Sequence, residues 1–175
     1  MKALKLVTLA LTFITVTSLA LISCEKNNET STLQIRLTDN PTAFQEVNVD
    51  IREVNVKFSD DSSSTSGWVS LATKAGIYNL LALQNGVDTL LATGTFPQDV
   101  VKEIRFVLGP NNTVKDNGIV YPLVIPSGSQ SGLKIKVNKK LGATLETLII
   151  DFDAALSVKK EGTGDYKLRP VLKIK

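Results

Sequence analysis

Hydrophobic and polar residues alternate along most of the chain after residue 32, with the period of two that is typical of β-strands. Residues 33–37 show the pattern first, and residues 47–51 show it again. The apolar positions then continue through residues 54–58, but shifted by one residue. Such a shift predicts a β-bulge near Arg52 and Glu53, where one extra residue enters the strand.

Two Asn-Gly pairs lie between apolar stretches and predict tight β-hairpins, because both residue types tolerate the positive φ angles that such turns need. Asn85-Gly86 separates residues 77–83 from residues 87–93. Asn117-Gly118 separates residues 113–115 from residues 119–124. The run of residues 80–83 is also compatible with one helical turn, and periodicity alone does not decide between the two.

The C-terminal half predicts further strands. Residues 133–137 alternate as a half-buried strand, and residues 145–152 are apolar on both faces, as in a central strand. Pro170 cannot donate to a ladder and indicates an edge strand or a break. Nine to eleven short strands with little or no helix favour an all-β fold, an antiparallel β-sandwich of the immunoglobulin-like or transthyretin-like kind, in one domain over residues 33–175.

Residues 1–23 have the pattern of a lipoprotein signal peptide. Two lysines precede the uncharged residues 6–22, and the stretch closes on Leu21-Ile22-Ser23-Cys24, which resembles a bacterial lipobox. We therefore expect removal of residues 1–23 and a covalent lipid on Cys24. A membrane helix is one alternative, although the run is short against the roughly 20 residues that span a bilayer. Ordinary cleavage with a free thiol is the other, because Ile22 is bulky for its position.

Residues 24–32 are predicted to be the lipidated cysteine and a flexible polar tether. The eight residues after Cys24 reach at most about 28 Å at roughly 3.5 Å each, so the domain is expected close to its membrane. Acidic residues after the cysteine resemble surface-export signals of one Gram-negative phylum. We expect attachment in a Gram-negative cell envelope, with the outer membrane favoured over the inner one and the periplasmic or surface side left open.

Composition excludes several classes of site. The chain has 20 Lys+Arg and 17 Asp+Glu, and since the signal peptide takes Lys2 and Lys5, the mature chain has 20 − 2 = 18 against 17. Such a near-neutral domain does not fit nucleic acid as a partner. The chain has no histidine and one cysteine, which excludes a Ser-His-Asp triad and a histidine-ligated metal. With Cys24 lipidated, no thiolate is left for catalysis or zinc.

Asp151 and Asp153 form the first candidate site. Two residues apart on a strand, they point the same way at roughly 7 Å, a separation that suits an inverting glycosidase. With Asp39 brought close by the fold, the three are a candidate Ca²⁺ site, although calcium takes six to eight oxygens and no compact Asp-rich loop is present. The interpretation that we favour is simpler: the aspartates lie at a strand end, solvated or paired with lysines.

Ser127 and Ser131 are further candidates for ligand contact, in the Ser- and Gly-rich segment 126–132. A serine nucleophile with Lys134 as its base is conceivable, but the segment lacks the G-x-S-x-G pattern, and a flexible or tightly turned loop explains it better. Trp68, Tyr78 and Tyr121 are a possible sugar-stacking platform, although scattered aromatic residues in a sandwich more often belong to the core.

Seven stretches, in order from residue 33 to the C-terminus, together resemble an uncharacterised family of bacterial exported lipoproteins, domain of unknown function 4382. They are Leu37-Thr38-Asp39-Asn40-Pro41, Leu80-Leu81 with Asn85-Gly86, Ile104-Arg105-Phe106, Pro126-Ser127-Gly128, Ser131-Gly132-Leu133-Lys134, Asp151-Phe152-Asp153-Ala154 with Ser157, and Leu168-Arg169-Pro170-Val171. Asn40 stands where the family pattern has alanine, a difference that touches only a turn. The resemblance implies an all-β, envelope-attached domain and brings no catalytic residue.

Three functions follow as hypotheses. The first is a non-enzymatic, lipid-anchored β-sandwich that binds or scaffolds an unknown ligand at the cell envelope, an envelope protein or a glycan, without a cofactor. The second is a glycan-binding accessory lipoprotein. The third is a hydrolase that uses the carboxylates of Asp151 and Asp153. The lipid anchor and the missing catalytic residue types favour the first.

Overall fold

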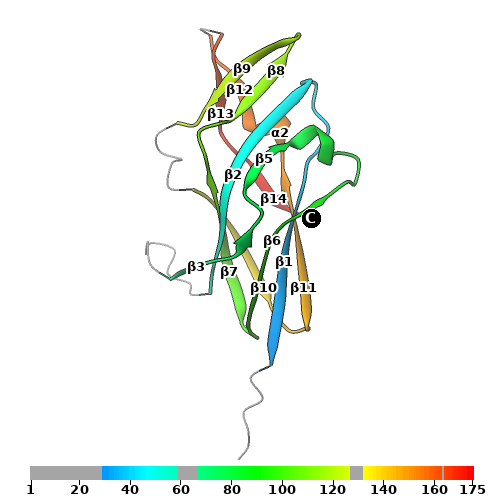
Figure 1. Cartoon of the computed structure of the whole chain (residues 1–175), viewed down its shortest axis with the longest axis vertical. Helices are drawn as coiled ribbons and strands as arrows, with labels where there is room; N and C mark the ends of the chain where they lie inside the picture. Colours follow the sequence, from blue (N-terminus) through cyan, green and yellow to red (C-terminus); the bar gives the residue numbers. More distant parts are fainter. Residues whose placement is uncertain (1–28, 59–66, 127–131, 163) are drawn as a thin grey trace, which may run out of the picture.

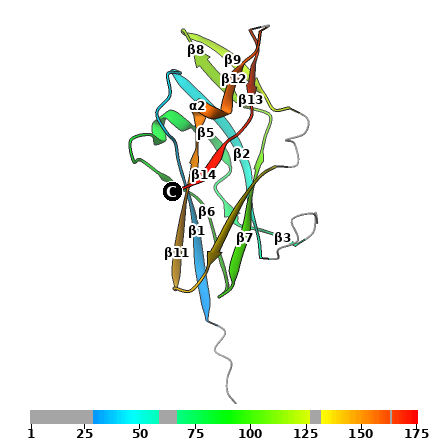
Figure 2. The same ribbon diagram turned by 180° about the vertical axis from the view of Figure 1, so that it is seen from behind.

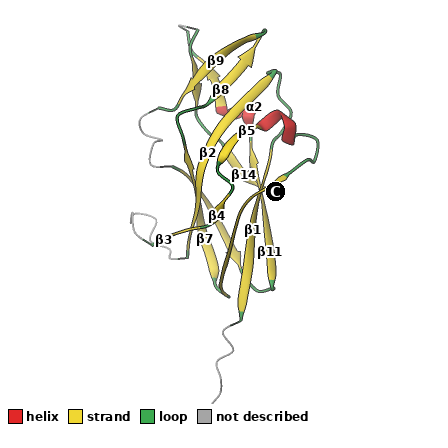
Figure 3. Ribbon diagram, viewed as in Figure 1, coloured by secondary structure: helices red, strands yellow, loops and turns green. Residues whose placement is uncertain are grey.

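The computed structural model describes residues 29–58, 67–126, 132–162 and 164–175, which form a sandwich of two mixed β-sheets (Figure 1). Strands dominate, and the two helical elements of this part of the chain are single short turns (Figure 3). The all-β sandwich that the alternation predicts is therefore confirmed. The signal peptide, Cys24, Ser127 and Ser131 lie outside the described residues.

The first sheet has the strand order β14-β11-β1-β6-β4. Its strands are β1 (Thr30–Thr38), β4 (Ala72–Thr73), β6 (Thr89–Pro97), β11 (Leu145–Phe152) and β14 (Leu172–Ile174). β1 begins three residues before the expected domain start at residue 33, so the expected tether boundary lies inside this strand. β11 is an interior strand, as predicted, although β1 holds the middle position and Leu145 is 53% exposed.

The second sheet has the order β10-β7-β2-β8-β9-β13-β12, and β3 and β5 also pair with β2. Its strands are β2 (Glu46–Lys57), β3 (Trp68–Ser70), β5 (Gly76–Asn79), β7 (Val100–Leu108), β8 (Thr113–Asp116), β9 (Ile119–Val124), β10 (Leu133–Lys140), β12 (Val158–Lys160) and β13 (Tyr166–Leu168). β2 is the longest strand and carries partners along both of its edges. The view from behind shows β7 and β10 running along the long axis below the β8–β9 pair (Figure 2).

The prediction that all strands pair antiparallel is wrong in two places. β1 runs parallel to β11, and β9 runs parallel to β13. Alternation of apolar residues defines the two faces of a strand but carries no information about its direction. β10 precedes β11 in the chain but lies in the other sheet. The chain therefore crosses from one sheet to the other after β10, and β11 then runs beside β1 in the same direction.

The bulge predicted near Arg52 and Glu53 is confirmed. The register of β2 against β7 shifts between Ile51 and Glu53. Ile51 and Val54 are both buried, while the two residues between them are exposed. The extra residue thus keeps the apolar side chains on the core side along the whole strand.

Only one of the two predicted hairpins exists. Asn117 and Gly118, with φ angles of 50° and 81°, join the antiparallel strands β8 and β9. Asn85 and Gly86 adopt similar angles of 57° and 84°, but β5 pairs with β2 and β6 pairs with β1, so no hairpin forms there.

The segment before Asn85 is the helical turn that the sequence left open. Residues Leu80–Leu83 form a 3-10 turn, η2, capped by the Asn79 side chain, which accepts from the Leu81 N–H. Leu80 and Leu83, three residues apart, are both buried, which is the spacing that places two side chains on one face of a 3-10 turn. Because the turn buries both leucines in the core, residues 80–83 form a 3-10 turn and do not continue strand β5.

The core lies between the two sheets. Its largest fully buried apolar side chains include Leu33, Ile35, Leu37, Ile51, Leu80, Leu91, Ile104, Phe106, Leu141, Phe152 and Tyr166. The break predicted at Pro170 is confirmed, because the chain leaves β13 in one sheet and enters β14 in the other at this point. A four-residue helix, α2 (Ala154–Ser157), follows β11.

Candidate functional site

The three candidate aspartates converge at one end of the β1–β11 pair. Because these strands are parallel, Thr38 lies opposite Asp151, and Asp39 continues from the same edge. Asp153 follows the end of β11 directly. Asp39 and Asp151 are each 1% exposed and Asp153 is 5% exposed. The fold thus brings together Asp39 and Asp151, which are 112 residues apart in the sequence.

Asp39 is held by two hydrogen bonds. Its Oδ1 accepts from the Ala154 N–H at 2.9 Å, and its Oδ2 accepts from Gln84 Nε2 at 3.1 Å. Burial raises the pKa of Asp39 above its usual value, and the nearby charge of Asp151 adds to this, while the hydrogen bonds only partly offset it. Asp39 is therefore a desolvated carboxyl that ties β1 to the start of α2.

Asp153 caps α2 and pairs with a lysine. Its Oδ1 accepts from the Leu156 N–H at 2.9 Å, and its Oδ2 lies 2.8 Å from Lys173 Nζ. Burial alone would raise the pKa of Asp153, but the hydrogen bonds from Lys173 and Leu156 outweigh it and hold the pKa below its usual value. The same contact raises the pKa of Lys173.

Asp151 has one satisfied and one unsatisfied oxygen. Its Oδ2 accepts from Asn40 Nδ2 at 2.5 Å and lies 3.6 Å from Lys175 Nζ. Its Oδ1 is buried and has no hydrogen-bond partner. A half-satisfied buried carboxylate costs stability, and the ammonium of Lys175 offsets part of that cost.

The three aspartates and their partners form a network of hydrogen bonds and ion pairs. Asp151 and Asp153 each lie against a lysine, which is the pairing that the favoured sequence interpretation expected. The carboxylates of Asp151 and Asp153 are buried, and an ammonium group lies against each. Across residues 29–58, 67–126, 132–162 and 164–175, no group of three or more His, Cys, Asp or Glu side chains is arranged to hold a metal ion. The network joins β14 and α2 to β1.

The aromatic residues do not form the stacking platform considered from sequence. Trp68 pairs with Lys57 at one end of β2, whereas Tyr78 pairs with Val49 toward the other end. Those two partners are eight positions apart on β2, which is about 26 Å along an extended strand. Tyr121 lies on β9 and packs on Tyr166, with ring centroids 4.9 Å apart. Each aromatic residue thus has a separate environment.

An apolar groove beside β9 is the feature that sequence reasoning missed. It has a volume of about 440 Å³ and is lined by Leu108, Gly109, Pro110, Asn112 and Pro122–Ile125. Val124 in this lining is 55% exposed, and Val120 on the same strand is 59% exposed. Residues 119–124 contain mostly apolar side chains, which in the sequence look the same as a strand covered on both faces.

The wall of this groove is fixed by a buried aspartate. Asp50 Oδ2 accepts from the Asn111 N–H at 3.2 Å and pairs with Arg52 at 2.8 Å. A Cβ atom on Gly109 would lie 2.2 Å from the same Oδ2, so only glycine lets the loop after β7 approach so closely. Asn112 Nδ2 donates to the Gly109 carbonyl at 2.7 Å and closes the loop.

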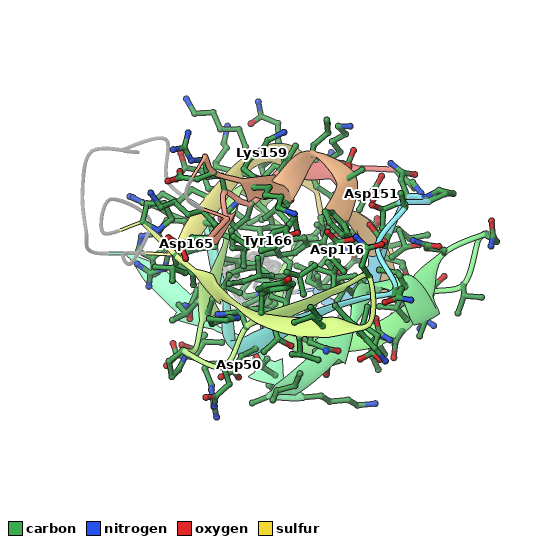
Figure 4. All side chains as sticks on the ribbon, turned by 90° about the horizontal axis from the view of Figure 1, so that it is seen from above. Asp50, Asp116, Asp151, Lys159, Asp165 and Tyr166 are labelled. Carbon is green, nitrogen blue, oxygen red and sulfur yellow. The ribbon has the colours of Figure 1, made fainter. Side chains whose placement is uncertain are left out.

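Tyr166 supports the other side of β9. Its ring is 2% exposed, and its hydroxyl donates to Asp116 Oδ2 at 2.5 Å. This hydrogen bond raises the pKa of Tyr166, and the nearby Lys160 ammonium lowers it in part. Figure 4, seen from above, shows Tyr166 between Asp116 and Asp165, with Asp50 and Lys159 on opposite sides. The bond joins β13 to β8 and holds the layer that carries the groove.

The comparisons give a family and no activity. The family model Domain of unknown function (DUF4382) matches residues 30–170. The chain belongs to this family. No curated protein and no solved structure matches the chain. The match covers the groove and the three aspartates, and it ends before Lys173 and Lys175.

A membrane-spanning helix is absent from the described part of the chain: none of its helices has the length and apolar character to cross a bilayer.

Proposed function

We propose that this protein is a lipid-anchored cell-envelope lipoprotein whose β-sandwich binds or scaffolds a partner protein without catalysing a reaction. The lipobox-like pattern at Cys24 supports the anchor, and the outer membrane of a Gram-negative bacterium is the proposed place of attachment. The proposal adds no cofactor beyond the lipid on Cys24.

The observation that carries the proposal is the separation of the two ends of the sandwich. β1 starts at Thr30 at the lower end, and the β8–β9 pair with the groove lies at the upper end (Figure 1). From Cys24 to Thr30 the chain makes six steps, which at roughly 3.5 Å each span at most about 21 Å. An anchor on Cys24 would keep the lower end near the bilayer and present the groove away from it.

The chemistry of the upper end supports a protein as the partner. The exposed valines of β9 and the groove form an apolar centre. The strands on either side of β9 each carry a lysine in an ion pair: Lys115 on β8 pairs with Glu46, and Lys167 on β13 pairs with Glu161. An apolar centre with a charged rim of both signs is the usual anatomy of a protein-binding surface. The partner would insert an apolar side chain into the groove.

The absence of catalysis rests on residue types and their contacts. The sequence has no histidine, and the lipid on Cys24 would consume its single thiol. The candidate carboxylates of Asp151 and Asp153 are buried against lysines. These observations support a binding role over a hydrolytic one.

Site-specific photocrosslinking in the cell tests the proposal. A photoreactive residue at Val124 should give one defined heterologous adduct, while the same residue at Ile77, equally apolar and 58% exposed on β5, should not. Val120→Glu should abolish the adduct at Val124. Equal adducts at both positions, or an adduct with a second copy of this chain alone, would contradict the proposal.

A further inference from the structure

A cluster of cations surrounds Trp68 on the second sheet, far along β2 from the groove. The Arg105 guanidinium carbon lies 4.6 Å from the centre of the Trp68 ring. Lys57 Nζ and Lys134 Nζ each lie 5.7 Å from it. Such distances are within the range of cation–π attraction. The four residues come from four adjacent strands, β3, β2, β7 and β10.

Two of these cations have no anionic partner in the described structure. Arg105 and Lys134 lie directly opposite each other on β7 and β10, and neither forms an ion pair or a hydrogen bond with another described residue. Like charges directly opposite on neighbouring strands destabilise a sheet. The Arg105 Nε and the Trp68 indole nitrogen are also left without an acceptor.

The Arg105 side chain is held in place by its surroundings. Gly132 has a φ angle of 92°, and a Cβ atom there would lie 2.8 Å from Arg105 Cγ. Glycine at this position therefore lets the Arg105 stem lie against the backbone, while the indole ring contacts the guanidinium. A guanidinium fixed in this way loses little conformational entropy when it binds an anion.

The cationic surface continues along the edge strand β10. Exposed and partly buried residues alternate along β10, and Lys134, Lys136 and Lys140 are three of the exposed ones. None of the three forms an ion pair with a described residue. Residues two apart on one strand face are about 7 Å apart. A hollow of about 110 Å³ lies on this track and is lined by Lys102, Glu103, Lys136 and Asn138.

We propose that this face, centred on Trp68 and Arg105 and extended by Lys134, Lys136 and Lys140, binds an acidic polysaccharide. A carboxylate or sulfate group of one sugar would accept from Arg105 and Lys134, and acidic groups further along the polymer would contact the β10 lysines. Charge complementarity carries the assignment, since Arg105 and the three β10 lysines form no ion pair with a described residue. The one carboxylate beside them, that of Glu103 opposite Lys136, is 5% exposed. The site is independent of the lipid anchor and of the β9 groove.

Other polyanions fit the surface less well. Binding of single-stranded nucleic acid depends on aromatic faces that are free for bases to stack on, and the Trp68 ring already has three cations over it. Two of the strands that carry the site, β2 and β7, run along the long axis of the molecule, and β3 projects to the side, so the site lies on the side of the molecule (Figure 2). A bilayer near the lower end would not lie flat against this side.

Trp68 is the only tryptophan in the chain, so its fluorescence reports on the site directly. The purified full chain in a neutral detergent is titrated with polygalacturonate, heparin, neutral dextran, a single-stranded oligothymidylate and phosphatidylglycerol vesicles. We expect a saturable change in emission with at least one of the two acidic polysaccharides, weakened by salt, and none with dextran. A response to the oligonucleotide or the vesicles but to neither acidic polysaccharide would overturn the proposal.

Matched variants separate the site from general charge. Lys134→Gln should weaken binding roughly tenfold, because a charge-assisted contact is lost. Lys159→Gln, on the exposed edge strand β12, removes the same charge and should leave binding unchanged. Lys134 is exposed, so its replacement leaves the fold intact. Equal affinity of the two variants would show that the β10 lysines only protect a sheet edge, and would overturn the proposal.

Discussion

Lys173 Nζ lies 2.8 Å from Asp153 Oδ2, and this ion pair joins the last strand of the protein to the cap of α2. The Asp153 side chain is 7% exposed and that of Lys173 is 49% exposed. The pair therefore sits at the boundary of the core, where the carboxylate is desolvated and the ammonium still reaches water. Asp153 also caps α2, so one side chain serves two contacts.

These two contacts can be separated by substitution. Asp153→Asn should cost about 1–2 kcal/mol in free energy of unfolding, because asparagine keeps the cap but loses the ion pair. Asp153→Ala loses both and should cost about 2–4 kcal/mol. Urea unfolding at pH 7 measures the difference. Equal losses for the two variants would show that the cap contributes nothing.

Asp153 and Asp39 should respond to pH in opposite directions. The pKa of Asp153 is held below 3.8, so its contribution to stability is present above that pH and is lost as pH falls through the lowered value. The pKa of Asp39 is raised above 3.8, so as pH falls this carboxylate takes up a proton at a higher pH in the folded state than in the unfolded state. Burial of the Asp39 charge therefore costs stability above the raised pKa, and this cost disappears on acidification.

The measurement for Asp39 is a comparison with Asp39→Asn. The free-energy difference between the two proteins should shift in favour of the wild type as pH falls from 7 toward 4. Asp153→Asn is the internal comparison: there the free-energy difference should shift against the wild type, and mainly at pH values below 3.8. Urea unfolding of all three proteins at several pH values gives both slopes. A difference for Asp39→Asn that is constant with pH contradicts the burial argument.

Gly109 should not tolerate a side chain. A Cβ atom there would meet Asp50 Oδ2 at 2.2 Å, so Gly109→Ala forces the loop and the buried carboxylate apart and should cost about 1–3 kcal/mol. Gly76→Ala is the control, because nothing lies within 4 Å of a Cβ atom at that position. Thermal unfolding of both variants is sufficient. Unchanged stability of Gly109→Ala would mean that the groove wall yields easily.

The Tyr166 hydroxyl should contribute to stability and that of Tyr121 should not. Tyr166→Phe keeps the ring packing but leaves the Asp116 carboxylate without its donor, at an expected cost of about 1–2 kcal/mol. The hydroxyl of Tyr121 forms no hydrogen bond with a described residue, and Tyr121→Phe should change stability by less than about 0.5 kcal/mol. Denaturant unfolding distinguishes these outcomes. A larger loss for Tyr121→Phe would reverse the assignment.

Local patterns predicted the strands well, but not their partners. The phase shift at Arg52 and Glu53 located a real bulge, because burial on one face fixes every second residue. The Asn85-Gly86 turn has the expected backbone angles, yet its flanking strands pair elsewhere. A turn is set by nearby residues, whereas strand pairing is set by distant ones. The parallel β1–β11 pair was missed for the same reason.

The candidate site divides in the same way. Asp39 and Asp151 do meet, and the lysines expected beside such aspartates are Lys173 and Lys175. The β9 groove was not predicted, because the sequence alone does not show whether a valine on a strand is exposed or buried. The cluster at Trp68 depends on register across four strands, which one sequence does not reveal.

The function that we propose depends on a lipid at Cys24, and metabolic labelling with an alkynyl palmitate analogue detects that lipid. We expect the wild-type protein to be labelled and recovered with membranes, and Cys24→Ser to be neither labelled nor anchored. Equal labelling of both proteins, or no labelling of the wild type, would contradict the proposal.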